Sequence, residues 1–184
     1  MELSEQEIIA LILEPSSREA AFKLLLKKYQ QRIYWHIRKM VIDHDDADDV
    51  TQESFIKVWT ALPNFRGDSR LFTWIYRIAT NECLNFLEKK KRKHSVSING
   101  EDEEFLTRNL ESSSYIDGTE VQLKLQKAIL TLPEKQRLVF NMKYFDDVTY
   151  EEMSEILETS VGALKSSYHF AVKKIESYFA QQVF

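Results

Sequence analysis

Apolar side chains recur at intervals of three and four residues along much of this chain, which is the spacing of one face of an α-helix. The longest stripe consists of Phe22, Leu26, Tyr29, Ile33, Ile37 and Met40. It predicts a core-facing helix of about 25 residues. A shorter helix is expected before it, because Ser4 and Glu7 have the spacing of a capping box and Pro15 stops the apolar run that follows.

Two more helices are expected in the N-terminal half of the chain. The first begins near residues 45–46 and ends at Leu62, because the next residue is a proline. The second begins near Phe72 and continues past Leu87 into a run of basic residues. A polar loop, NFRGDSR, separates the two helices. These elements form a predicted helical domain over residues 1–94.

The C-terminal part, residues 119–184, ends in a compact pair of predicted helices. Before this pair, the pattern indicates one helix over about residues 119–132 and another after the proline that follows. Thr149 caps the first helix of the pair, and Ser160 caps a longer helix that reaches roughly Phe179. A short turn between two helices, the second longer than the first, is typical of a helix-turn-helix.

The stretch between these two parts, residues 95–118, lacks a helical stripe. It contains two of the four glycines and six acidic residues against one arginine, so we expect a flexible acidic linker. With only four glycines and three prolines in 184 residues, the chain lacks the turn residues that a β-sandwich or barrel needs. The predicted fold is therefore all-α, with two helical domains joined by the linker.

Charge and cysteine content narrow the class of protein. The 25 basic residues are outnumbered by 29 acidic ones, and a net charge of −4 argues against a protein that coats duplex DNA by counterion release. The one cysteine, Cys83, excludes an internal disulfide. No apolar run approaches the roughly 20 residues of a membrane span or follows a basic N-terminus. We therefore expect a cytoplasmic protein without membrane insertion.

The run DHDDADDVTQE, residues 43–53, contains six carboxylates and no lysine or arginine. One face of the helix predicted there holds Asp45, Asp49, Gln52, Glu53 and Ile56. We interpret this face as a docking surface for a basic partner, and the alternative is a solvated face beside a helix N-terminus. His44 and Asp48 alone do not make a metal site, so none is predicted.

A second candidate surface lies on the loop and helix over residues 65–94. Its helix turns Trp74, Arg77 and Asn81 away from the expected core. Tryptophan offers a stacking surface, and arginine and asparagine offer hydrogen-bond donors, which together suit an unstacked single strand of nucleic acid. Alternatively, Trp74 packs beneath the preceding loop. Five consecutive basic residues, 89–93, follow as a candidate backbone contact or an ordinary solvated helix end.

A third candidate surface lies on the second helix of the helix-turn-helix. The packed face of this helix consists of Leu164, Tyr168, Ala171 and Ile175. The outward face, which could reach a major groove, consists of Lys165, Ser166, His169 and Lys173.

Signatures of catalysis are missing from the sequence. The four histidines and Cys83 show no catalytic or metal-ligand pairing, and the glycines lie too far apart for a phosphate-binding loop. We therefore predict no enzymatic activity, no catalytic residue and no cofactor.

Three motifs, in order, resemble the extracytoplasmic-function sigma factors, a group of the sigma-70 family of bacterial RNA polymerase. The first motif, residues 46–59 (DADDVTQESFIKVW), resembles the region two segment that docks on the clamp helices of the polymerase β′ subunit. The second, residues 65–87 (FRGDSRLFTWIYRIATNECLNFL), resembles the loop and helix that open and read the minus-ten promoter element. The third, residues 132–175, resembles region four, which reads the minus-thirty-five element as duplex.

The resemblance implies a transcription initiation factor that binds core RNA polymerase, directs it to specific promoters and promotes DNA melting. The implied polymerase contacts are Asp45, Asp49, Gln52, Glu53 and Ile56. The implied minus-ten contacts are Phe65, Arg66, Asp68, Ser69, Trp74, Arg77 and Asn81. The implied minus-thirty-five contacts are Lys165, Ser166, His169 and Lys173. Further implied partners are the β flap of the polymerase, promoter DNA and an anti-sigma factor.

The recognition helix departs from the family's pattern. Ser167, Phe170 and Val172 stand where many relatives carry basic residues, so we expect this domain to bind duplex DNA weakly without a partner. An autonomous helix-turn-helix regulator that binds an operator without polymerase remains an alternative. A helical adaptor, whose acidic face binds a basic protein and whose helix pair is only structural, is another.

Overall fold

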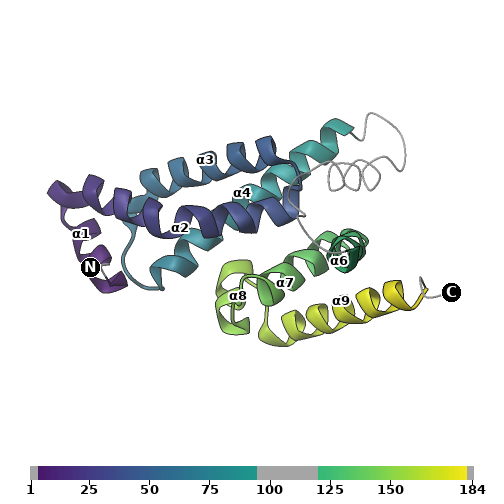
Figure 1. Cartoon of the computed structure of the whole chain (residues 1–184). Coiled ribbons are helices and arrows are strands. Elements are labelled where there is room, and N and C mark those ends of the chain that lie inside the picture. Colours follow the sequence, from purple (N-terminus) through teal and green to yellow (C-terminus); the bar gives the residue numbers. More distant parts are fainter. Residues whose placement is uncertain (1–3, 95–119, 182–184) are drawn as a thin grey trace.

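The computed structural model describes residues 4–94 and 120–181, and this part of the chain is helical and contains no strand (Figure 1). The helices of the N-terminal half are α1 (Glu5–Leu13), α2 (Arg18–Val41), α3 (His44–Ala61) and α4 (Leu71–His94). Those of the C-terminal half are α6 (Glu120–Leu130), α7 (Glu134–Tyr144), α8 (Tyr150–Leu157) and α9 (Val161–Gln181). The all-α prediction is confirmed. The predicted linker, residues 95–118, lies outside the described residues.

Capping signals in the sequence set the boundaries of the N-terminal helices. At α1, the Ser4 hydroxyl accepts from the Glu7 amide at 3.3 Å, and the Glu7 carboxylate accepts from the Ser4 amide at 2.7 Å. The Asp43 carboxylate accepts from the Asp46 amide at 3.0 Å, so α3 begins at His44, slightly before the expected start.

The helices α2, α3 and α4 pack as a bundle, with α1 across one end (Figure 1). From Tyr29 onward, the predicted stripe of α2 is buried. In the first turns of α2, however, Ala21 and Leu25 take the core positions, and Phe22 and Leu26 are only half-buried. The stripe therefore differs from the prediction at its N-terminal end, because the helix turns these two large side chains toward α3 and the solvent.

The C-terminal helices enclose a second, smaller core. It consists of Ala128, Ile129, Leu132, Phe140, Ala171 and Ile175. Thr149 and Glu152 form the capping box that begins α8, and the Ser160 hydroxyl accepts from the Ala163 amide at 3.3 Å at the start of α9. Glu158 turns the chain between the two helices in the left-handed region, with φ 50°. The helices α8 and α9 thus form the predicted helix-turn-helix.

The two halves lie against each other as two layers (Figure 1). The helix α7 packs on α2, and α8 packs on α4. One buried apolar cluster includes side chains from both halves, and its C-terminal members are Leu138, Val139, Met142, Val148, Met153, Ile156 and Leu164. The sequence predicts two helical domains but not this direct packing. The boundaries at residues 1–94 and 119–184 stay predictions.

Candidate docking and nucleic-acid surfaces

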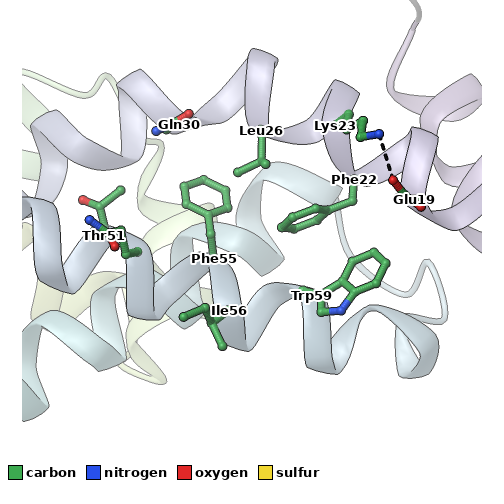
Figure 2. Close-up of a pocket in the computed structure, with 10 residues that line it drawn as sticks. Glu19, Phe22, Lys23, Leu26, Gln30, Thr51, Phe55, Ile56 and Trp59 are labelled. Carbon is green, nitrogen blue, oxygen red and sulfur yellow. Dashed lines mark ion pairs between the residues drawn. The ribbon is translucent and has the colours of Figure 1, made fainter.

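A groove of about 610 Å³ lies between α2 and α3 (Figure 2). Its apolar side chains are Phe22, Leu26, Phe55, Ile56 and Trp59, and its polar ones are Glu19, Lys23, Gln30, Thr51 and Gln52. Ile56 is 57% exposed and Trp59 is 41% exposed. The Trp59 ring lies 5.0 Å from the ring of Phe22 across the groove. A contiguous apolar surface of this kind, open to water, is typical of a site for a protein partner.

Two of the predicted docking residues line this groove, and the other three lie on the same helix, α3. Gln52 and Ile56 line it, and Asp45, Asp49 and Glu53 are exposed on the same helix. Within the described residues, none of these three carboxylates forms an ion pair, so their charge faces solvent uncompensated. The structure therefore joins the acidic face predicted from the sequence to an apolar groove.

The sequence analysis did not identify two aromatic groove residues, exposed Trp59 and half-buried Phe22, as part of a surface. Trp59 lies about one turn beyond Ile56 on the exposed side of α3, so helical spacing could have identified it. Phe22 carries no such signal, because the apolar stripe of α2 assigned it to the core.

The loop before α4 and the exposed side of that helix form the second candidate surface. Arg66, Asp68, Arg77 and Asn81 are exposed, and Ser69 is half-buried. Gly67 provides a left-handed turn within the loop, with φ 79°. The exposed guanidinium and amide groups can donate hydrogen bonds to phosphates and to the edges of unstacked bases.

The two aromatic members of this predicted surface, Phe65 and Trp74, pack on each other. Phe65 is 5% exposed, and its ring lies 5.0 Å from that of half-buried Trp74. This is the packing beneath the loop that stood as the alternative for Trp74. The pair packs the start of the loop against α4, with Phe65 buried and Trp74 half-buried.

The outward face of α9 forms the third candidate surface. Lys165, Ser166, His169 and Lys173 are all exposed, as the spacing predicts. Phe170 is 55% exposed on the same side of the helix, an apolar group beside these polar ones. The Lys165 ammonium lies 5.7 Å from the centre of the Tyr150 ring on α8.

A buried carboxylate joins the two halves of the structure. Asp146, in the turn after α7, is 7% exposed, and it accepts hydrogen bonds from the Tyr76 hydroxyl and the Lys39 ammonium. His36 Nδ1 lies 3.1 Å from its Oδ2 atom, and Arg32 Nη2 donates to its backbone oxygen at 2.7 Å. Burial alone would raise the pKa of Asp146, but the hydrogen bond from His36 and the charge of Lys39 lower it to about 2. Burial lowers the pKa of His36, against the opposite effect of the Asp146 carboxylate.

No pattern in the sequence identified this cluster. Its members come from α2, α4 and the turn after α7, and Asp146 follows His36 by 110 residues. Only the packing of the two halves brings these side chains together.

Neither a metal centre nor a reactive thiol is found among residues 4–94 and 120–181. No group of three or more histidine, cysteine, aspartate or glutamate side chains is placed there to hold a metal ion. Burial raises the pKa of the Cys83 thiol to about 12, so it is not a thiolate at neutral pH. In the same residues, no helix is long and apolar enough to cross a membrane.

Comparison with known proteins identifies relatives of the whole chain. The Sigma-70 region 2 family model matches residues 25–93, and the Sigma-70, region 4 model matches residues 122–175. The RNA polymerase sigma-H factor of Pseudomonas aeruginosa is 34% identical over 179 residues, which cover 94% of this chain and 92% of that relative. The ECF RNA polymerase sigma-E factor of Escherichia coli K12 is 30% identical, over 95% of this chain and 96% of that relative.

Several solved structures share the fold, among them the following two. The sigma factor RpoE, in its co-crystal structure with the anti-sigma factor NepR from Bartonella quintana, has a TM-score of 0.68 at 20% identity, over 88% of this chain and 98% of that one. CnrH, in complex with the cytosolic domain of CnrY, has a TM-score of 0.70 at 19% identity, over 97% of this chain and 98% of that one.

These matches cover both halves of the chain in the order that the three motifs predicted. They do not favour an autonomous regulator that works without polymerase. The chain belongs to the extracytoplasmic-function group of the sigma-70 family, whose members are transcription factors rather than enzymes and direct RNA polymerase to promoters.

Proposed function

We propose that this sigma factor docks on core RNA polymerase through the α2–α3 groove and reads promoter DNA with two surfaces, one in each half. The observation that carries the docking proposal is the exposed apolar groove bordered by three uncompensated carboxylates, Asp45, Asp49 and Glu53. Exposed apolar side chains favour a protein partner, and the carboxylates favour a basic one. By the family resemblance, that partner is the clamp-helix pair of the β′ subunit.

Within the groove, Ile56 and Trp59 are the candidate anchors. They are the large apolar side chains of α3 that water reaches, and aromatic anchors of this kind carry much of the binding energy of an interface. The carboxylates lie toward the rim, where charge steers association more than it adds affinity. Gln52 lines the groove beside the anchors and offers an amide for a hydrogen bond.

The loop before α4 and the exposed side of α4 are the candidate minus-ten surface. Arg66, Asp68, Ser69, Arg77 and Asn81 supply its polar contacts. The Phe65–Trp74 pair supplies a stacking site, and a flipped base enters it when the loop lifts from α4. Base capture and DNA melting are then one event, because the captured base leaves its stack.

The outward face of α9 is the candidate minus-thirty-five surface. Lys165 and Lys173 are the cations among its predicted contacts, beside Ser166 and His169. Few phosphate contacts give weak binding and a shallow dependence on salt. We therefore propose that this domain reads duplex DNA when the β flap of the polymerase holds it at high effective concentration.

An anti-sigma factor is a further partner in this proposal. The RpoE and CnrH structures are both of complexes, one with the anti-sigma factor NepR and one with the cytosolic domain of CnrY. A protein that covers the α2–α3 groove of this chain would exclude polymerase from it. We also propose that the chain acts in the cytoplasm, where polymerase and DNA are, and that it catalyses no reaction and uses no cofactor.

Run-off transcription with purified core polymerase and a genomic DNA library tests this function. The wild-type chain should give discrete transcripts that core enzyme alone does not give. The double variant D49K/E53K should lose co-purification with core enzyme, because it places two cations opposite a basic partner. The matched control is E155K/E176K, which makes the same change of charge at exposed positions on α8 and α9.

The control should keep polymerase binding. If D49K/E53K keeps its helicity and still binds core enzyme as the control does, the docking proposal is wrong.

A further inference from the structure

The acidic helix α8 covers part of the minus-ten surface on α4. The two helices pack together, and Met153 and Ile156 of α8 are buried in the apolar cluster that the halves share. Four carboxylates and no lysine or arginine occur in residues 150–158. The first helix of the helix-turn-helix thus presents negative charge to a helix with a proposed nucleic-acid surface.

Two ion pairs cross this contact. The Arg70 guanidinium donates to the Glu152 carboxylate at 2.7 Å, and that of Arg77 donates to the Glu158 carboxylate. Arg77 is one of the proposed minus-ten contacts, and Arg70 ends the loop that carries others. Each arginine therefore binds a carboxylate with the same donors that would bind a DNA phosphate.

The buried contacts of Asp146 hold the same arrangement at a second place, between the turn after α7 and the helices α2 and α4. Its carboxylate accepts from Tyr76 of α4 and Lys39 of α2, and Arg32 donates to its backbone oxygen at 2.7 Å. Asn141 of α7 adds a contact of 3.5 Å to the backbone oxygen of Lys39. These directional, buried contacts set one orientation of the C-terminal half on the N-terminal half.

We propose that the helix-turn-helix is an intramolecular competitor of promoter DNA: α8 binds the arginines of the minus-ten surface, and Asp146 anchors this closed arrangement. The inference rests on the proposed function of that surface. The competitor is tethered to its site, so its effective concentration exceeds that of free DNA. Because closed molecules do not bind DNA, the apparent affinity for single-stranded DNA is the intrinsic affinity multiplied by the fraction of open molecules.

The closed arrangement leaves the α2–α3 groove open, since every residue that lines the groove belongs to α2 or α3 and none to the C-terminal half. Polymerase can therefore dock while the minus-ten surface is covered. Opening follows when promoter DNA and polymerase together favour the separated halves. This order would keep the free factor from binding single strands elsewhere.

The first test measures binding of the full chain to a short fluorescein-labelled DNA single strand of random sequence. The variant E152Q/E158Q removes the two carboxylates that pair with Arg70 and Arg77, and glutamine at 152 can still complete the capping box with Thr149. The affinity should rise about three- to tenfold, as expected for the loss of two exposed ion pairs. The matched control, E151Q/E155Q, removes the same charge from exposed positions of α8 and should stay within about twofold of wild type.

The second test measures the distance between the halves with spin labels on the variant T60C/S177C, both at exposed positions. Every variant also carries C83A, because Cys83 is 1% exposed only while the halves are packed together, with Arg137 and Glu134 of α7 nearby, and would otherwise take the label when they separate. The wild-type background should give a narrow distance distribution, and adding D146N should give a broad one with longer distances. D147N, at the exposed neighbouring residue, is the control and should leave the distribution narrow.

Equal single-strand affinity of E152Q/E158Q and E151Q/E155Q, or an unchanged distribution in D146N, would overturn the inference. Failure of every variant to bind the single strand would overturn it as well. Run-off transcription with core enzyme reports separately on the proposed function, because a factor without the closed arrangement would still initiate transcripts.

Discussion

Replacing Asp146 with asparagine should lower the free energy of unfolding at pH 7 by about 2 to 4 kcal/mol. The shift of its pKa from 3.8 to about 2 corresponds to roughly 2 kcal/mol of stabilisation of the ionised form, at about 1.4 kcal/mol per unit. The change also removes the charge partner of Lys39, whose side chain is 9% exposed, and removal of one partner from a buried pair costs about 3 to 5 kcal/mol. The amide keeps the shape of the carboxyl group, so the loss falls toward the lower values.

Urea unfolding of D146N, followed by circular dichroism and tryptophan fluorescence, measures this loss. The control is D147N, because Asp147 is exposed and asparagine tolerates its left-handed backbone, φ 53°. The control should stay within about 0.5 kcal/mol of wild type. If D146N also stays within that range, the carboxylate does not stabilise the contact between the halves as an ionised, paired group.

The direction of the pKa shift sets the pH range of this effect. The pKa of Asp146 is lowered in the folded chain, so its stabilisation is present above the unfolded pKa of about 4 and is lost as the pH falls toward 2. The difference in stability between wild type and D146N should therefore shrink over this range. If the stability difference between wild type and D146N stays constant from pH 4 to pH 2, the pKa of Asp146 is not lowered in the folded chain.

The remaining predictions concern three other side chains. Burial lowers the pKa of His36, so the unfolded chain binds the proton more readily, and stability should fall as the pH drops from 7.5 toward 5.5. H36Q should weaken this dependence in thermal unfolding, and an unchanged dependence would contradict the lowered pKa. W59A should weaken binding to core polymerase by about tenfold or more, as measured by fluorescence anisotropy. It should change the stability of the chain little, because Trp59 is 41% exposed. If W59A and wild type bind core polymerase with equal affinity, Trp59 is not an anchor. F170R should tighten binding to duplex DNA, because it adds a phosphate contact at an exposed position of α9. A plot of the logarithm of the binding constant against the logarithm of the salt concentration should become steeper by nearly one unit. An unchanged slope would mean that this surface of α9 does not contact the DNA.

Local signals predicted the elements and their exposed faces. The capping boxes at Ser4 and Thr149 set where α1 and α8 begin, because a side chain three residues away can reach the orphaned backbone amides. The acidic face of α3 and the polar face of α9 were found in the same way, since the direction of a side chain on a helix follows from its position.

The candidate site was harder to predict where two packing choices satisfy the same pattern. Phe22 fits the apolar stripe of α2, but Leu25 and Ala21 fill the core beside it, which leaves the larger ring in the groove. Trp74 fits a polar helix face, but the loop folds back and covers it with Phe65. Periodicity gives the direction of a side chain but not what will lie against it.

Sequence patterns thus suffice for the helices, their caps, the two-part organisation and most of the exposed polar residues, because each depends on neighbours within a turn or two of helix. The groove and the contact between the halves required the folded chain. Arg70 meets Glu152 across 82 residues and His36 meets Asp146 across 110, and such pairs form only where the folded chain brings the two side chains within hydrogen-bond distance in the right geometry. That geometry depends on how whole helices pack, and no local spacing records it.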